Sequence, residues 1–150
     1  MERNSNLTEV LNDLIRINND RTTGYAKAAD NAREIDVDLR TIFDKMGDES
    51  RKYSRELADE VIRLGGQPAT GTTASGKIYR AWMDVKATFT GKDRKSILAA
   101  CEFGEDQAQK AYDEALNSDG IDDLTCQMIR SQKEVLKKQH DQVKALRDKC

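Results

Sequence analysis

The chain of 150 residues has little of what a β-sheet, a disulfide framework or a membrane span requires. It contains one proline, one histidine, three cysteines and only 5% aromatic residues. With so few prolines and many Ala, Glu, Lys, Leu and Arg residues, the composition favours long helices over sheets. No stretch approaches the roughly 20 apolar residues of a membrane-spanning helix, and the N-terminus lacks the apolar centre of a signal peptide. We therefore expect one all-α domain over residues 1–150, cytoplasmic and without a membrane partner.

The cysteines and the charges argue against two further classes of protein. Cys101, Cys126 and Cys150 are odd in number and have no CxxC spacing, unlike a disulfide framework or a zinc knuckle. The simpler interpretation is reduced thiols, although Cys150 at the terminus could join two chains through an intermolecular disulfide. The 25 basic and 27 acidic residues are spread along the chain and give a net charge of −2. Nucleic-acid binding is not expected, because it needs a concentrated basic surface.

Capping residues divide the chain into four long amphipathic segments. Asn6, with Glu9 three residues later, forms a capping box, and Asp36, Asp93 and Asp122 can each cap a later helix. Each segment carries apolar residues at steps of three and four, the period of one helix face. Long helices are predicted at about 7–33, 37–64, 94–117 and 123–149, with a short amphipathic helix at 76–88.

The lengths of the connections predict the topology. The first two helices are joined tightly, as are the last two, so each pair is expected to be antiparallel. Gly65-Gly66 can end the second helix in the left-handed conformation, and Pro68 prevents its continuation. The segment from Gly65 to Lys92 is long enough to run the length of a bundle and return. One long crossover between the second and third helices is the ferritin-like arrangement of a four-helix bundle.

Several short stretches resemble a known family. They are Leu11-Asn12-Asp13-Leu14-Ile15, Leu64-Gly65-Gly66-Gln67-Pro68 and Gly104-Glu105-Asp106, supported by residues 76–82 and 140–144. The chain is similar, over nearly its whole length, to an uncharacterised bacterial ferritin-like family known as domain of unknown function 2383. The resemblance implies a four-helix bundle and no established reaction.

Glu105 interrupts the apolar face of the third long helix. A carboxylate in a core stripe is costly unless it is hydrogen-bonded, ion-paired or bound to a metal ion. In one interpretation Glu105 is a structural carboxylate that accepts hydrogen bonds, and Glu105→Gln then costs about 1–2 kcal/mol. The expected donors are Asn18, Tyr25, Tyr53 and Gln132. Other residues predicted to lie inside are Leu14, Phe43, Leu57, Ile97, Ala108, Tyr112 and Val143, with Met128, Val135 and Gln139 on the inward face of the last helix.

The second interpretation makes Glu105 a metal ligand. Di-iron bundles take a Glu from each of two helices and a Glu-x-x-His pair from each of the others. Asn18, Ser50, Tyr53 and Val135 stand where several of those ligands would be, so no six-ligand di-iron centre is expected. An oxygen-rich cluster with one imidazole suits Mn, Mg or Ca better than a tight zinc site. If a cofactor is bound, we expect a divalent metal ion, iron or manganese. The candidate ligands are Glu105, His140, Glu56, Glu60 and Asp20.

The sequence therefore leaves two functions open. The first is a non-enzymatic structural or interaction module that forms a homo-oligomer, a dimer or larger, with no cofactor and no catalytic residue. A role in stress physiology would rest on analogy to other ferritin-like proteins alone. The second is a metal-binding protein for iron or manganese storage or oxidation, with a non-standard site around Glu105. A small-ligand binder with a polar interior is a third, weaker hypothesis.

Overall fold

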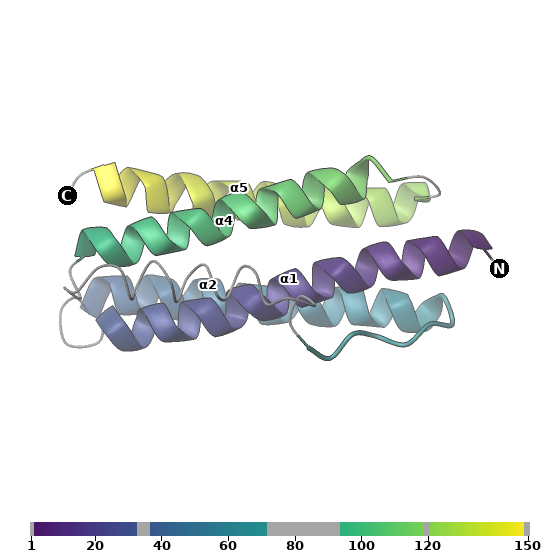
Figure 1. Ribbon diagram of the computed structural model, residues 1–150, viewed down its shortest axis with the longest axis horizontal. Coiled ribbons are helices and arrows are strands. Elements are labelled where there is room, and N and C mark those ends of the chain that lie inside the picture. Colours follow the sequence, from purple (N-terminus) through teal and green to yellow (C-terminus); the bar gives the residue numbers. More distant parts are fainter. Residues whose placement is uncertain (1, 33–36, 72–93, 119–120, 149–150) are drawn as a thin grey trace.

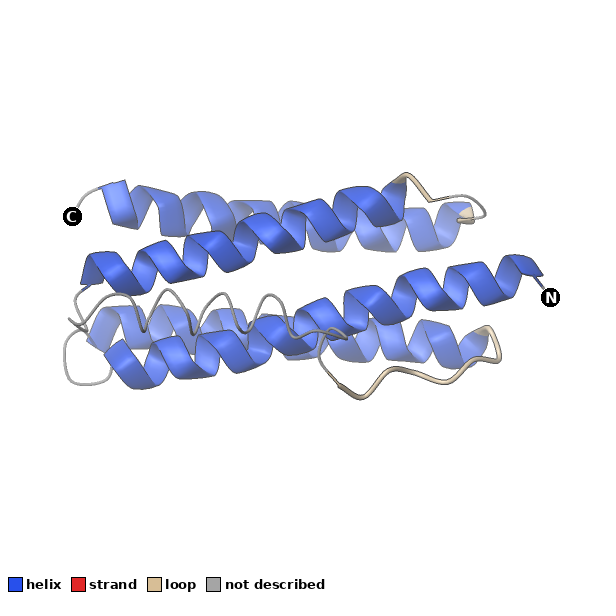
Figure 2. Ribbon diagram, viewed as in Figure 1, coloured by secondary structure: helices blue, strands red, loops and turns tan. Residues whose placement is uncertain are grey.

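The computed structural model describes residues 2–32, 37–71, 94–118 and 121–148. All regular structure in these ranges is helical, as Figure 2 shows. The expected all-α fold is therefore confirmed, while the short helix predicted at 76–88 lies outside the described residues. No helix in the described ranges is long and apolar enough to cross a membrane. The helices are α1 (Glu2–Ala32), α2 (Val37–Arg63), α4 (Arg94–Leu116) and α5 (Asp123–Asp148).

The four helices form two antiparallel pairs stacked on each other (Figure 1). α1 pairs with α2, α4 pairs with α5, and α1 also packs against α4. α2 and α4 run in the same direction, so the chain must travel back along the bundle between them. This is the predicted ferritin-like topology, which follows from two short connections and one long one.

Local capping explains two of the helix ends. Gly65 has φ 82°, the Gly65 amide donates to the carbonyl of Ile62, and the Gly66 amide donates to the carbonyl of Val61. These two bonds are the Schellman motif, which closes α2 as predicted. A Cβ on Gly66 would lie 2.6 Å from Cγ2 of Thr8 in α1, so this glycine also permits close packing. At the start of α5, Asp122 Oδ1 accepts the amide of Thr125 at 2.7 Å, the expected N-cap bond. 

The predicted start of the first helix is wrong. α1 begins at Glu2, so Asn6 lies inside the helix and does not cap it. Neither glycine nor proline occurs among residues 2–6, and Asn and Ser cost only about 0.5 kcal/mol each in a helix interior. A capping sequence marks a place where a helix can begin, but it does not prevent the preceding turn from being helical.

Two asparagines hold the start of the long connection against α1. Asn12 Nδ2 donates to the carbonyl of Gln67 at 3.0 Å, and Asn12 Oδ1 accepts the amide of Ala69 at 2.7 Å. One heptad further along, Asn19 Nδ2 donates to the carbonyl of Gly71 at 2.8 Å. Residues 67–71 are thereby directed back along the bundle, because both asparagines lie on one face of α1.

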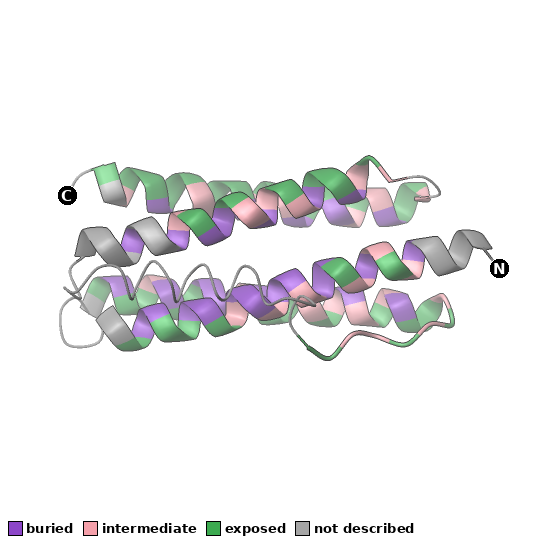
Figure 3. Ribbon diagram, in the orientation of Figure 1, coloured by how far each residue is buried: buried purple, intermediate pink, exposed green. Residues whose placement is uncertain are grey.

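The core consists of two apolar clusters, one in each half of the bundle. Figure 3 shows the buried residues gathered on the inner faces of the helices. On α5 the predicted inward face is rotated by about one residue: Ile129 and Leu136 are fully buried, whereas Met128 and Val135 are only half-buried. The side chain of Ile97 is not described. The other six predicted core residues are buried: Leu14, Phe43, Leu57, Ala108, Tyr112 and Val143.

Candidate functional site

A layer of polar side chains lies where the two apolar clusters meet. Its residues come from all four helices and point into the bundle, the place where ferritin-like metal proteins hold their ions. Burying so many polar groups is tolerated only if they satisfy one another. The buried members of this layer are Asn18, Arg21, Ser50, Glu105 and Gln132. Asp20 and Thr125 are the other buried polar residues in the described part of the bundle.

Arg21 of α1 and Glu105 of α4 form a fully buried ion pair. Arg21 Nε donates to Glu105 Oε1 at 3.0 Å, and Nη2 donates to the same oxygen. Both side chains are 0% exposed. Arg21 Nη1 also donates to Ser50 Oγ, and Nη2 donates to Gln139 Oε1 at 2.7 Å. The guanidinium thereby joins all four helices, and its planar fork of donors suits this role.

Tyr25 completes the surroundings of the ion pair. Its hydroxyl donates to Glu105 Oε1, and its ring centroid lies 5.4 Å from Arg21 Cζ. Burial lowers the pKa of Arg21, but the Glu105 carboxylate together with Tyr25 and Tyr112 outweighs burial and raises the pKa, so the guanidinium stays charged. Burial raises the pKa of the Tyr25 phenol and the Cys101 thiol, and Glu105 raises both further. Neither group is therefore ionised at neutral pH.

A second hydrogen-bonded chain crosses the bundle nearby. Asn18 Nδ2 donates to Tyr112 Oη at 2.8 Å, Tyr112 Oη donates to Gln132 Oε1 at 2.6 Å, and Gln132 Nε2 donates to Glu56 Oε2 at 3.1 Å. Asn18 Nδ2 also donates to the carbonyl of Leu14. Burial raises the pKa of Tyr112, which keeps its hydroxyl a donor. Within the described residues this chain pairs the Tyr112 hydroxyl and the Gln132 amide, whereas Asn18 Oδ1 accepts no hydrogen bond.

Glu105 lies inside, as predicted, and one of its four expected donors is confirmed. Tyr25 donates to it, whereas Asn18 and Gln132 belong to the second chain. Tyr53 is buried, and burial together with the neighbouring Glu49 raises its pKa. Glu105 Oε2 accepts no hydrogen bond from the part of the chain that the structure describes.

Sequence reasoning missed Arg21 as the main partner of Glu105. A signal was present, because Arg21 falls on the inward stripe of the first helix between Asn18 and Tyr25. Opposite charges on the inward faces of two helices can neutralise each other if they lie at the same height. Heights in different helices cannot be compared until the helices are packed, so the sequence alone did not reveal the pair.

The other candidate ligands are spread along the bundle. Asp20 is buried on α1, and Glu56 binds Gln132 in the second chain. Glu60 pairs with Arg63 near the end of α2. His140 faces the outside of the α4–α5 pair and contacts Asp106. 

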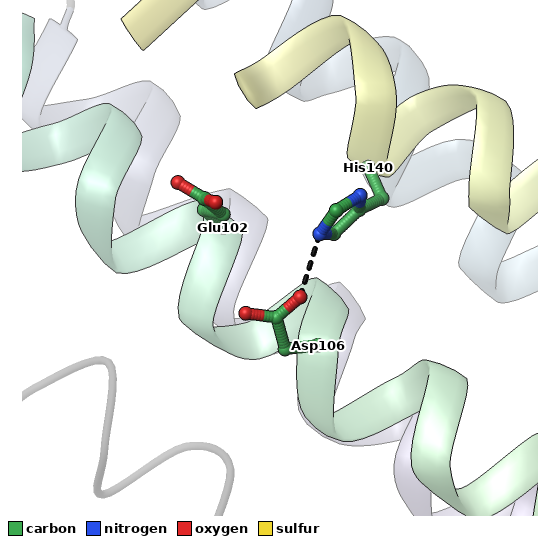
Figure 4. A group of neighbouring side chains, drawn as sticks. All are labelled: Glu102, Asp106 and His140. Atoms are coloured by element: carbon green, nitrogen blue, oxygen red, sulfur yellow. Dashed lines mark hydrogen bonds and ion pairs between the residues drawn. The ribbon is translucent and has the colours of Figure 1, made fainter.

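The described residues contain one group of three His, Cys, Asp or Glu side chains whose ligand atoms lie within 4.8 Å of one another. It consists of Glu102, Asp106 and His140 (Figure 4) and excludes Glu105. A metal ion held by Glu105 with the other four candidates therefore stays a prediction. Arg21 and Tyr25 both bind Glu105 Oε1, so this oxygen is not free to bind a metal ion.

Comparisons with known proteins agree with this architecture. The model of the family described as domain of unknown function (DUF2383) matches residues 6–118, and the chain belongs to this family. No curated protein gives a significant match. Among solved structures, a point mutant of Mycobacterium smegmatis Dps1 superposes with a TM-score of 0.81 and 19% sequence identity, over 97% of this chain and 97% of that chain. At this identity the likeness shows the fold alone, which is ferritin-like.

Proposed function

We propose that this protein is a non-enzymatic ferritin-like bundle that serves as a structural or interaction module in a homo-oligomer. The observation that carries the proposal is the Arg21–Glu105 ion pair at the centre of the bundle. In metal-binding bundles the inward carboxylates are neutralised by the bound ions. In this protein the guanidinium of Arg21 supplies the positive charge that bound ions supply in metal-binding bundles.

The charge balance of the interior supports the absence of a metal centre. Arg21 remains charged, and its donors are taken up by Glu105, Ser50 and Gln139. A divalent ion bound to Glu105 would lie within a few ångströms of the guanidinium, where like charges repel strongly because water is excluded. Binding there would require Arg21 to leave the core.

Exposed apolar side chains support self-association. Ile62 is 60% exposed and Leu124 is 73% exposed. They lie at the same end of the bundle, because Arg63 Nη2 is 4.0 Å from Asp122 Oδ2. Large apolar residues are enriched in homo-oligomer interfaces. We expect this end to contact a second copy of the chain in the cytoplasm.

Iron oxidation tests the first part of the proposal. Untagged protein is mixed aerobically with Fe²⁺, and ferric product is followed by absorbance. We expect the same rate as with an equal concentration of bovine serum albumin, and equal amounts of bound iron in the wild type and in Glu105→Gln by elemental analysis. Saturable acceleration that disappears in Glu105→Gln, with iron retained by the wild type, would favour the metal-binding alternative instead.

Sedimentation tests the second part. Ile62→Glu with Leu124→Glu adds two charges to the proposed interface and should shift the protein toward the monomer. Ala145→Glu is the matched control, because Ala145 is exposed near the opposite end of α5. A wild-type protein that sediments as a monomer at micromolar concentrations would contradict the oligomer, and so would a double variant that associates as well as the wild type.

A further inference from the structure

A second group of ligand-type side chains lies outside the polar interior, on the α4–α5 pair. Glu102 and Asp106 are four residues apart on α4, so both carboxylates project from one face of that helix. His140 reaches the same face from α5, and Figure 4 shows its imidazole directed toward Asp106. His140 Nε2 lies 2.6 Å from Asp106 Oδ1.

We propose that Glu102, Asp106 and His140 bind one divalent first-row transition-metal ion. One ligand atom from each residue lies within 4.8 Å of the others. Atoms that share an ion at about 2.0–2.2 Å are about 3–4 Å apart, so small rotations of the side chains suffice. Two helices supply the ligands, and their packing fixes the distance between the carboxylates and the imidazole.

The imidazole is already oriented for this role. His140 Nδ1 lies 3.2 Å from Asp141 Oδ1, a carboxylate outside the group of three ligands. A carboxylate on one ring nitrogen directs the other nitrogen toward the metal in many histidine sites. Here Nε2 faces Asp106. The ion would take the position of the proton between Nε2 and Asp106 Oδ1, and that proton would pass to solvent.

The donor set indicates the class of ion. One imidazole nitrogen and two carboxylate oxygens suit Mn²⁺, Fe²⁺ or Zn²⁺, whereas Mg²⁺ and Ca²⁺ prefer oxygen ligands alone. The Asp106 side chain is 53% exposed, so water can fill the remaining coordination positions. By the general order of affinities Zn²⁺ should bind more tightly than Mn²⁺.

The site is separate from the buried ion pair, although Glu105 and Asp106 are neighbours in sequence. Glu105 is fully buried and Asp106 is exposed, because adjacent residues of a helix point about 100° apart and so lie on different faces of α4. The surface site thus requires no change in the interior. Its existence does not depend on the proposed structural role.

The single histidine of the chain permits a direct experiment. In untagged protein, the two carbon-bound ring protons of His140 are the only imidazole signals in a proton NMR spectrum. Paramagnetic Mn²⁺ should broaden them at less than one ion per chain, while the same concentration of Mg²⁺ should not. In Asp106→Asn and in Glu102→Gln, at least tenfold more Mn²⁺ should be required for the same broadening.

Glu114→Gln is the matched control, because Glu114 is another exposed carboxylate on α4. It should respond to Mn²⁺ as the wild type does. Calorimetry with Zn²⁺ provides a second measurement, in which His140→Gln should lose at least tenfold in affinity. Equal broadening in Asp106→Asn and wild type, or equal Zn²⁺ affinity in His140→Gln and wild type, would overturn the proposal. A need for millimolar Mn²⁺ in the wild type would do the same.

Discussion

Glu105 and Asp106 are adjacent carboxylates with opposite environments. Glu105 is fully buried and is paired with Arg21, whose side chain is also 0% exposed. Asp106 is 53% exposed and is paired with His140, whose side chain is 19% exposed. Both pairs connect α4 to another helix. They differ in burial and in the nature of the cation.

The difference shows which cation each environment permits. A buried carboxylate needs a partner that stays charged at all accessible pH values, and arginine meets this condition. At the surface, water stabilises a carboxylate alone, so a partner that loses its proton near neutral pH is tolerated. The interior pair is therefore fixed, whereas the surface pair can exchange its proton for a metal ion.

Removing one charge of the interior pair should have the largest effect on stability. Arg21→Met leaves the Glu105 carboxylate buried without a counter-charge and should cost about 3–5 kcal/mol. The free energy of unfolding in urea measures this cost. Arg16→Met is the control on the same helix, because Arg16 pairs with the exposed Asp13, and it should cost less than about 1 kcal/mol. Equal losses in the two variants would contradict the structural role of the buried pair.

Removing both charges should restore much of the lost stability. Buried ion pairs replaced by apolar residues of similar volume are often neutral in stability or gain it. Arg21→Met with Glu105→Leu should therefore be more stable than Arg21→Met alone.

Glu105→Gln should cost about 3–5 kcal/mol in the free energy of unfolding, because it leaves the Arg21 guanidinium buried without a counter-charge. This is more than the cost that the sequence suggested.

An apolar substitution provides a scale for these losses. Leu57 of α2 is 0% exposed and belongs to the apolar cluster that also contains the N-terminal half of α1. Leu57→Ala should cost about 2–5 kcal/mol through lost transfer energy and the cavity left behind. Leu124→Ala should be nearly neutral in the monomer, because Leu124 is 73% exposed. A loss below about 1 kcal/mol for Leu57→Ala, measured by urea unfolding, would mean that α2 packs with another face inward.

The neutral polar chain should be less sensitive than the ion pair. Tyr112→Phe removes the hydroxyl that links Asn18 to Gln132 and should cost about 1–3 kcal/mol. The ring remains, so the packing is preserved and the loss reports the hydrogen bonds. Urea unfolding of Tyr112→Phe beside Arg21→Met ranks the two polar groups. A larger loss for Tyr112→Phe would reverse the comparison between neutral and charged polar groups.

The surface pair should show the smallest effect and a dependence on pH. Burial lowers the pKa of His140, but Asp141 and Asp106 outweigh it and raise the pKa above the ordinary 6.5. A histidine with a raised pKa in the folded state stabilises the protein below pH 6.5 and loses this effect as pH rises through the folded value. His140→Gln should thus be less stable than the wild type by under about 1 kcal/mol at pH 5. The difference in melting temperature between His140→Gln and the wild type should be smaller at pH 8 than at pH 5. An equal difference at both pH values would contradict the raised pKa of His140.

The candidate site was only partly visible in the sequence. The position of Glu105 on an apolar stripe predicted a buried carboxylate that needs a partner, and the structure confirms its burial. The inward tyrosines Tyr25, Tyr53 and Tyr112 were also predicted and are buried. The five ligands that the sequence suggested around Glu105 do not lie together in the structure. The face of a helix on which a residue lies does not fix its height along the bundle relative to residues of the other helices.

Periodicity, capping residues and connection lengths determined the four helices, the Schellman end of α2 and the ferritin-like topology. These features depend on neighbours in the sequence, so they can be read from it. Only the packed bundle decided that Arg21 meets Glu105 inside, while Asp106 meets His140 outside. Such contacts depend on the relative rotation and height of whole helices, and side chains from every helix set these together.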